Sequence, residues 1–174
     1  MRAVFFDRDN TLTKDDGYCH KIADFAWIDG APEALARLAR AQVPVFIVTN
    51  QGGIGKGIFT TQQMHDFNNH LQAQAKLAGG KIHDIAFCPH HPQALTDEDR
   101  LCSCRKPQAG MIKALAQKWD IMLANSVMIG DRDSDVLAGQ EAGCHSYLFD
   151  PKTNLDALVK TILETHFNSN SPVT

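Results

Sequence analysis

The stretch MIGDRDSD at residues 128–135 decides the fold, because a short apolar run leads directly into a cluster of carboxylates. The same arrangement opens the chain, where the apolar run 3–6 is followed by Asp7. Short apolar runs that end in polar residues are typical of buried strands in a parallel sheet. Runs of this kind predict strands at 3–6, 43–48, 82–87, 126–129 and 146–149.

Hydrophobic residues recur at helical spacing between these runs, which predicts helices over 35–39, 64–78, 112–119, 136–142 and 155–162. Thr60 and Gln63 form a capping box before the second helix, and Gly79 and Gly80 end it. Gly143 stands where the fourth helix should end. Strands and helices therefore alternate. This order predicts an α/β fold with a doubly wound parallel sheet, whose ligands bind at the carboxyl ends of the strands.

The length and composition fit one domain. The chain has 174 residues, of which 44% are hydrophobic and 21% charged, enough to bury a core. We expect a single domain over 1–167 and a polar tail over 168–174. The net charge of −3 and the scattered basic residues argue against nucleic acid as a partner. The first apolar run is too short for a leader peptide or a membrane span, so we expect a cytoplasmic protein. We also expect it to be a monomer and to act on a small molecule.

Polar side chains gather at the predicted carboxyl ends of the strands. Asp7 and Asp9 follow the first strand, Thr49 the second and Asp131 the fourth, and Lys106 opens the third helix. Taken singly, each could be a turn former or a helix cap. Together they would place several carboxylates within a few ångströms, which is unfavourable unless a hard divalent cation such as Mg²⁺ lies among them. A phosphate on that ion could be attacked by one carboxylate while Lys106 and Thr49 hold its other oxygens.

Four segments, in this order, resemble the motifs of the haloacid dehalogenase (HAD) superfamily: DRDNT at 7–11, VTN at 48–50, Lys106, and GDRDSD at 130–135. The resemblance implies a HAD-like phosphatase fold. One position departs from the pattern, because Asn10 stands where the superfamily usually has glycine. Asparagine is the non-glycine residue that best tolerates a left-handed backbone, so the loop is compatible with Asn10, and its exact geometry stays open.

The resemblance also implies the chemistry. Asp7 is expected to be the nucleophile that forms an aspartyl-phosphate, and Asp9 the general acid that later acts as general base. Thr49 and Lys106 are expected to bind the transferring phosphoryl group. The implied Mg²⁺ ligands are Asp7, the backbone carbonyl of Asp9, Asp131 and the backbone of Arg132, with Asp135 supporting them indirectly.

The cysteines concentrate in one loop, 88–104. The chain has five, an odd number that excludes a complete set of internal disulfides. Cys88 stands before His90 and His91, and Cys102 and Cys104 have C-x-C spacing. Thiolates and imidazole in this pattern suit tetrahedral Zn²⁺, and four protein ligands would make the zinc structural. Spacing alone leaves both histidines open, and the alternative to a metal site is a reduced, metal-free loop.

The patterns C-P-H-x-P and C-x-C-R-K-P in this loop are similar to those of the heptose bisphosphate and histidinol-phosphate phosphatases of the superfamily, which carry a zinc loop at this place. The implied zinc ligands are Cys88, His90, Cys102 and Cys104. Such a loop would deliver Arg105 and Lys106 to the phosphate. Cys19 and Cys144 are left over, and we interpret both as structural or neutral.

The chain leaves no room for a cap domain, so we expect an open site whose specificity comes from loops. The candidates are DDGY at 15–18, TNQGG at 49–53, and Arg105. On composition alone the glycine-rich segment could be only a flexible turn, and Arg105 could form a surface ion pair. The expected substrate contacts are Asp15, Asp16, Gly17, Tyr18, Thr49, Asn50, Gln51, Gly52, Arg105 and Lys106.

VTNQGGIGKG at 48–57 and DGYCHKIADFAWIDGA at 16–31 are more similar to the heptose 1,7-bisphosphate 7-phosphatases than to the histidinol phosphatases. The resemblance implies an Mg²⁺-dependent hydrolase that removes the 7-phosphate of D-glycero-D-manno-heptose 1,7-bisphosphate, in lipopolysaccharide-core or related carbohydrate metabolism. Arg105 could then hold the phosphate that is not transferred. Two alternatives are a histidinol-phosphate phosphatase and an enzyme that transfers the phosphoryl group to an acceptor other than water. A third is an inactive phosphatase fold that binds a protein, but the intact acidic and lysine motifs argue against this third alternative.

Overall fold

The computed structural model describes residues 1–167, and the polar tail predicted at 168–174 lies outside the described residues. Its centre is a five-stranded sheet with the strand order β3-β2-β1-β4-β5, in which every pair of neighbouring strands is parallel. The predicted α/β class and doubly wound parallel sheet are confirmed. The strands are β1 (Val4–Phe6), β2 (Val45–Asn50), β3 (Asp84–Cys88), β4 (Val127–Gly130) and β5 (His145–Leu148).

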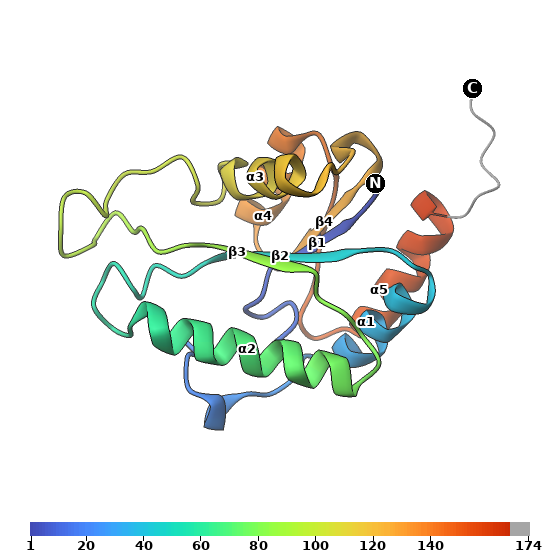
Figure 1. Cartoon of the computed structure of the whole chain (residues 1–174), viewed down its shortest axis with the longest axis horizontal. Helices are drawn as coiled ribbons and strands as arrows, with labels where there is room; N and C mark the ends of the chain where they lie inside the picture. Colours follow the sequence, from blue (N-terminus) through green and yellow to red (C-terminus); the bar gives the residue numbers. More distant parts are fainter. Residues whose placement is uncertain (168–174) are drawn as a thin grey trace.

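Helices cover both faces of the sheet (Figure 1): α1, α2 and α5 pack on one face, and α3 and α4 on the other. Their bounds are α1 (Ala31–Arg40), α2 (Thr61–Leu77), α3 (Gly110–Trp119), α4 (Asp133–Ala142) and α5 (Leu155–Ile162), with short helical turns at η1 (Ile22–Asp24), η2 (Leu123–Asn125) and η3 (Leu163–Phe167). The capping box is formed, since Thr60 Oγ1 accepts the Gln63 N–H at 3.1 Å. Gly143 ends α4 with a φ of 88°.

The central strand β1 is buried on both faces. Val4 and Phe6 belong to the core between the sheet and α1 and α5, whereas Phe5 belongs to the core beneath α3 and α4. All three side chains are 0% exposed. A strand covered on both sides needs apolar residues at every position, which explains the uninterrupted apolar run in the sequence. Burial of each phenylalanine contributes about 1.5–3 kcal/mol to stability.

Strand β2 runs two residues further than the sequence predicts. The expected strand ended at Val48, but Thr49 pairs with Phe87 and Asn50 pairs with Cys88 of β3. Both polar residues therefore have a backbone fixed by the sheet. Their side chains start from a rigid element at its carboxyl end, where ligands bind in folds of this kind.

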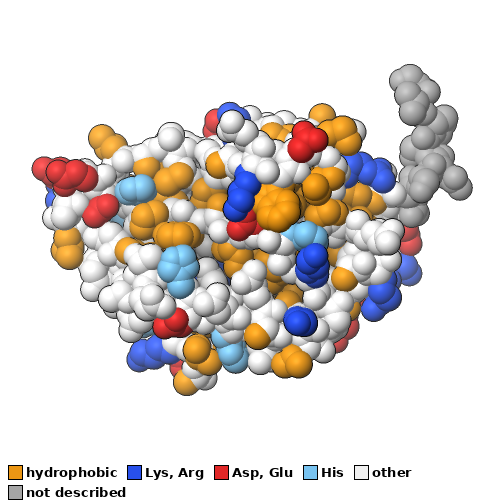
Figure 2. All heavy atoms as spheres, in the orientation of Figure 1, with side chains coloured by type: hydrophobic (Ala, Val, Ile, Leu, Met, Phe, Trp, Pro, Cys, Tyr) orange, Lys and Arg blue, Asp and Glu red, His pale blue; other side chains and the backbone are white. Residues whose placement is uncertain are grey.

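From β1 the chain adds β2 and β3 on one side of the sheet, and then β4 and β5 on the other side. Open α/β sheets form their ligand crevice at such a switch, which here lies between β1 and β4. Asp7 follows β1 directly, and Asp131 follows β4. The loops 51–60 and 89–109 extend from the same end of the sheet, at the left of Figure 1. Figure 2 shows several acidic side chains on the surface at this end of the molecule.

Between β1 and β2 the chain forms only loops, η1 and α1, so residues 1–167 contain no separate cap domain at this place. None of the described helices combines the length and apolar character needed to cross a bilayer.

Candidate active site

Lys106 is the centre of a buried ionic cluster at the carboxyl ends of β1 and β4. Its Nζ lies 2.5 Å from Asp7 Oδ1, 2.6 Å from Asp135 Oδ1 and 2.8 Å from the carbonyl oxygen of Val48. The side chains of Asp7, Lys106 and Asp135 are at most 9% exposed. The fold therefore brings together groups from the end of β1, the loop before α3 and the first turn of α4.

The cluster holds more negative charge than its lysine can balance. Burial raises the pKa of Asp7 to about 7; Lys106 opposes this shift, and Asp135 and Asp9 add to it. Burial and the neighbouring Asp135 also raise the pKa of Asp131. Burial acts to lower the pKa of Lys106, but Asp7 and Asp135 outweigh it and hold that pKa above its ordinary value. Further positive charge at this place would stabilise the ionised carboxylates.

The carboxylates provide the donors that a hard cation needs. Oxygens of Asp7, Asp131 and Asp135 lie within 4.8 Å of one another. Asp131 Oδ1 is buried and has no hydrogen-bond partner among the described residues, although buried polar atoms are nearly always paired. Carboxylate and carbonyl oxygens are the ligands that Mg²⁺ prefers. The residues present therefore fit the predicted Mg²⁺ site.

Asp135, which we expected to support the metal ligands only indirectly, is itself a member of this cluster. Its Oδ1 contacts Lys106, and its Oδ2 accepts the backbone N–H of Arg132 at 3.0 Å. The same bond closes the first turn of α4. Asp135 therefore links the lysine to the segment that follows β4.

Asp9 is held at both carboxylate oxygens. Its Oδ1 accepts Arg8 Nε at 2.8 Å, and its Oδ2 accepts Gln51 Nε2 at 2.8 Å. Gln51 Nε2 also donates to Thr49 Oγ1 at 2.8 Å. The Thr49 side chain is completely buried, and Gln51 connects its hydroxyl to the Asp9 carboxylate. Asn50, an expected substrate contact, uses its side-chain amide on the backbone of Lys106.

A cavity of about 460 Å³ opens beside the cluster, within the roughly 300–1,000 Å³ of small-molecule sites. The expected substrate contacts that line it are Asp15, Gly17, Tyr18, Asn50, Gln51, Gly52, Arg105 and Lys106. The expected catalytic and metal-binding residues that line it are Asp7, Asp9 and Arg132. Asp16, Thr49 and Asp131 are expected site residues that do not line it. The structure thus gathers most of the predicted contacts around one space.

Gly52 stands at a close approach of two loops. A Cβ at this position would lie 2.9 Å from a ring carbon of His91 and 3.0 Å from Arg105 Nη1. Glycine therefore lets both side chains reach the cavity. Asn10 has a left-handed backbone, with a φ of 58°, a conformation that asparagine tolerates better than other non-glycine residues. Its side chain accepts the Asp15 N–H at 3.0 Å and donates to the Asp15 carbonyl at 3.1 Å, which fixes the start of the 15–18 segment.

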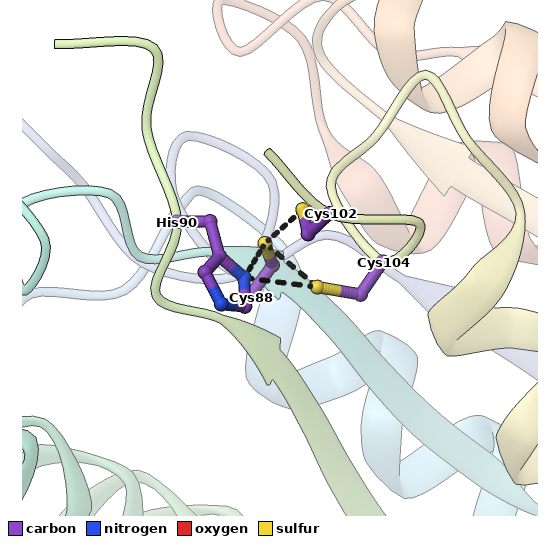
Figure 3. A group of neighbouring side chains, drawn as sticks. All are labelled: Cys88, His90, Cys102 and Cys104. Carbon is purple, nitrogen blue, oxygen red and sulfur yellow. Dashed lines mark hydrogen bonds between the residues drawn. The ribbon is translucent and has the colours of Figure 1, made fainter. Parts of the chain in front are cut away.

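The second group of potential metal ligands lies in the loop after β3 (Figure 3). Its members are Cys88, His90, Cys102 and Cys104. Cys88 Sγ lies 3.0 Å from Cys104 Sγ and 3.5 Å from Cys102 Sγ, and His90 Nδ1 lies 3.4 Å from Cys104 Sγ. The ligand atoms of a tetrahedral zinc site are roughly 3.7 Å apart, so the group needs little expansion to take Zn²⁺. His91 lies outside this group and lines the cavity.

The cysteine cluster is connected directly to the cavity. The backbone N–H of Arg105 donates to Cys102 Sγ at 3.4 Å, and Arg105 Nη1 donates to the carbonyl of His90 at 2.9 Å. Lys106 follows immediately. An ion bound by the cluster would therefore fix the two basic residues that enter the cavity.

Comparisons with known proteins agree with this geometry. Residues 103–161 match a HAD-hydrolase-like family model. A D-glycero-beta-D-manno-heptose-1,7-bisphosphate 7-phosphatase of Haemophilus ducreyi is 39% identical over 143 residues, which cover 82% of this chain and 79% of the relative. An enzyme of the same name from Rhodopseudomonas palustris is 35% identical over 162 residues, covering 92% and 89%. The chain belongs to the HAD phosphatases.

The fold of this phosphatase is also found in solved structures. The D,D-heptose 1,7-bisphosphate phosphatase of B. bronchiseptica, complexed with magnesium and phosphate, superposes with a TM-score of 0.78 at 29% identity, covering 100% of this chain and 92% of that one. A HAD-like protein of Mesorhizobium loti has a TM-score of 0.85 at 24% identity, covering 98% and 90%. The predicted membership of the superfamily is confirmed.

Sequence reasoning missed three polar residues of this phosphatase. His91 and Ser134 line the cavity, but His91 had been considered only as a rival zinc ligand and Ser134 lies between two motif aspartates. Arg8 is 1% exposed and contacts Asp9. The only available signal for Arg8 was its place between the two aspartates of the first motif, which does not reveal the direction of the side chain.

Proposed function

We propose that this phosphatase removes the 7-phosphate of D-glycero-β-D-manno-heptose 1,7-bisphosphate in an Mg²⁺-dependent reaction. The two relatives described above, which bear this name, support the substrate at 39% and 35% identity. The observation that carries the reaction is the buried cluster, in which Lys106 contacts Asp7 and Asp135 while Asp131 Oδ1 lacks a partner among residues 1–167. A phosphate bound together with a divalent cation fits this arrangement.

Asp7 is proposed as the nucleophile. One of its carboxylate oxygens attacks the phosphorus, the bond between phosphorus and the sugar oxygen breaks, and the leaving oxygen takes a proton from Asp9. An aspartyl-phosphate remains on Asp7. Asp9 then removes a proton from a water molecule, whose oxygen attacks the phosphorus. The bond between phosphorus and the Asp7 oxygen breaks, which regenerates the Asp7 carboxylate and releases inorganic phosphate. Nucleophilic attack and proton transfer are thus divided between two carboxylates.

The proposed Mg²⁺ ligands are Asp7, Asp131, the backbone carbonyl of Asp9 and the backbone of Arg132. When bound, the ion polarises the phosphoryl group and offsets its negative charge. Lys106 binds a phosphoryl oxygen, and its contact with Asp135 holds the ammonium group in position. Thr49 is proposed to assist through its hydroxyl, which Gln51 orients.

Arg105 is proposed to bind the 1-phosphate. One Nη1 hydrogen is used on the carbonyl of His90, which leaves further N–H groups of the guanidinium for a phosphate. Burial, together with the charges of Arg105 and Lys56, holds the pKa of His91 below its ordinary value, and the two charges would favour a bound phosphate. The segment 15–18 is proposed to face the sugar, chiefly through Asp15, Gly17 and Tyr18, which line the cavity. Asp16 belongs to the same segment.

The cysteine cluster is proposed to bind structural Zn²⁺ and to hold the loop that carries Arg105 and Lys106. Thiolate ligands must stay reduced to bind a metal, and cysteines stay reduced in the cytosol, so a cytoplasmic location fits the proposed zinc site.

The proposal is tested by measuring phosphate release with Mg²⁺ from the β- and α-anomers of the heptose bisphosphate and from histidinol phosphate. We expect the highest kcat/KM with the β-anomer and release of only one phosphate per sugar. Asp7→Asn should reduce turnover to background while the circular dichroism spectrum is unchanged. A preference for histidinol phosphate would overturn the substrate, and a lack of turnover on every phosphate ester would overturn the reaction.

A further inference from the structure

Arg8 is the largest fully buried side chain of the described residues, with 1% exposure. It follows Asp7 directly in the sequence. A guanidinium taken out of water loses several kcal/mol of hydration free energy, which the protein must replace with well-placed partners. The proposed reaction does not use Arg8, because Lys106 already supplies the positive charge that binds the phosphoryl group.

Arg8 forms a closed ring of hydrogen bonds with two other side chains, those of Asp9 and Gln51. Arg8 Nε donates to Asp9 Oδ1 at 2.8 Å, and Arg8 Nη2 donates to Gln51 Oε1 at 3.1 Å. Gln51 Nε2 donates in turn to Asp9 Oδ2 at 2.8 Å. Each oxygen of the Asp9 carboxylate therefore has one fixed donor, so the plane of the carboxylate cannot rotate without breaking a bond.

The ring is anchored on two further elements. Arg8 Nη1 donates to Asn68 Oδ1 of α2 at 3.0 Å, and Arg8 Nη2 donates to the carbonyl of Cys19 at 3.0 Å. The guanidinium carbon lies 4.7 Å from the centre of the Phe67 ring. These contacts hold the guanidinium in addition to its bonds with Asp9 and Gln51, so its position is set by α2 and the loop at Cys19 as well as by the ring.

We propose that Arg8 is a positioning residue, which acts with Gln51 to aim the Asp9 carboxylate at the oxygen of the leaving group. The inference rests on the proposed function, in which Asp9 transfers protons. Arg8 does not line the cavity, and its side-chain hydrogen bonds within residues 1–167 go to Asp9, Gln51, Asn68 and Cys19 rather than to Asp7. Its effect on the reaction passes through the orientation of Asp9.

This role has a consequence that depends on the leaving group. A sugar alkoxide is a poor leaving group and needs its proton during bond breaking, whereas 4-nitrophenolate leaves readily without one. A misdirected Asp9 should therefore slow cleavage of an alkyl phosphate much more than cleavage of 4-nitrophenyl phosphate. The kinetic constant to compare is kcat/KM, because it reports only the steps up to the first phosphoryl transfer.

The experiment measures kcat/KM of the wild type and of Arg8→Lys with the heptose bisphosphate and with 4-nitrophenyl phosphate, in Mg²⁺. Lysine keeps the charge but cannot contact Asp9 and Gln51 with the geometry of a guanidinium. We expect the loss on the heptose bisphosphate to exceed the loss on 4-nitrophenyl phosphate by about 10-fold or more. Gln51→Leu breaks the ring at another point and should show the same selective loss, which keeps the test available if Arg8→Lys does not fold.

Two controls separate positioning from general damage. Arg37→Lys alters a two-bond ion pair with Asp156 between α1 and α5, away from the cavity, and should leave the ratio of the two kcat/KM values unchanged. In an Asp9→Asn background, Arg8→Lys should cause no further selective loss, because both changes act on the same proton transfer.

Equal losses on both substrates in Arg8→Lys and Gln51→Leu would overturn the positioning role and leave the proposed function intact. A further selective loss in the Asp9→Asn background would also overturn it. Wild-type protein that hydrolyses neither substrate overturns the proposed function itself and the inference with it. If the wild type cleaves 4-nitrophenyl phosphate but not the heptose, the proposed substrate fails, and histidinol phosphate serves as the alkyl phosphate in the same comparison.

Discussion

Asn50 and Lys106 are joined by two hydrogen bonds that run in opposite directions. Asn50 Oδ1 accepts the backbone N–H of Lys106 at 3.0 Å, and Asn50 Nδ2 donates to the backbone carbonyl of Lys106 at 3.1 Å. Asn50 is the last residue of β2. The backbone position of the lysine is therefore set by the sheet as well as by the loop that precedes it.

Asn50→Ala should misplace Lys106 without removing its charge. We expect kcat to fall by about 10- to 100-fold, because a displacement near 1 Å at a reacting group has an effect of this size. The two lost hydrogen bonds should lower the free energy of unfolding by about 1–3 kcal/mol. Steady-state kinetics and urea unfolding measure the two effects. Asn154→Ala is the matched control, because Asn154 caps α5 and its loss should reduce stability by about 1 kcal/mol with kcat unchanged. A normal kcat in Asn50→Ala would contradict the prediction.

The fold and the acidic motifs could be predicted because they follow from local patterns. Apolar runs identify strands, and the topology then places Asp7 and Asp131 at neighbouring strand ends. The contacts of Asn50, Gln51 and Arg8 could not be predicted in this way. Each makes at least one bond to a residue that is distant in sequence, such as Arg8 to Asn68, Gln51 to Asp9 and Asn50 to Lys106, and a single sequence carries no signal for such pairings.

Removal of the proposed zinc should reduce both stability and catalysis. Burial raises the pKa of Cys88, so the free thiol is protonated at neutral pH and metal binding must displace that proton. Cys102→Ser should bind less than one zinc per chain, lower the free energy of unfolding by several kcal/mol and lower kcat about 10-fold or more, since Cys102 contacts the backbone of Arg105. Elemental analysis, chemical unfolding and kinetics test these effects together.

The control for this variant is Cys144→Ala. Cys144 is also buried, but it lies outside the cysteine cluster in a predominantly apolar environment that raises its pKa to about 12. Its substitution should leave zinc content and kcat unchanged. Full zinc content in Cys102→Ser, or normal kcat after complete removal of zinc by a chelator, would contradict the predicted link between the loop and catalysis.

The stabilising effect of Mg²⁺ should increase with pH. Burial raises the pKa of Asp7 from 3.8 to about 7 in the metal-free protein, so the folded state binds a proton more tightly than the unfolded state does. The free energy of unfolding of the metal-free protein should therefore fall as pH rises from about 4 to about 7, by on the order of 1–4 kcal/mol. Mg²⁺ replaces that proton, and its binding should raise Tm more at pH 8 than at pH 5.

Differential scanning fluorimetry at the two pH values, with and without Mg²⁺, tests this dependence. Asp131→Asn provides the comparison, because it removes one proposed ligand oxygen and should weaken the Mg²⁺ effect at pH 8. An equal shift of Tm at both pH values would show that protons and Mg²⁺ do not compete at this cluster.

Arg105 should decide between substrates with and without a second phosphate. Arg105→Lys keeps one charge but loses the planar pair of N–H donors, and we expect KM for the heptose 1,7-bisphosphate to rise about 10-fold or more with a small change in kcat. Heptose 7-phosphate lacks the second phosphate, so its kcat/KM should change by less than about twofold. The substitution also removes a bond to His90, and zinc content must therefore be measured in the same preparation. If zinc is retained and both substrates lose kcat/KM equally, Arg105 supports the loop and does not bind the 1-phosphate.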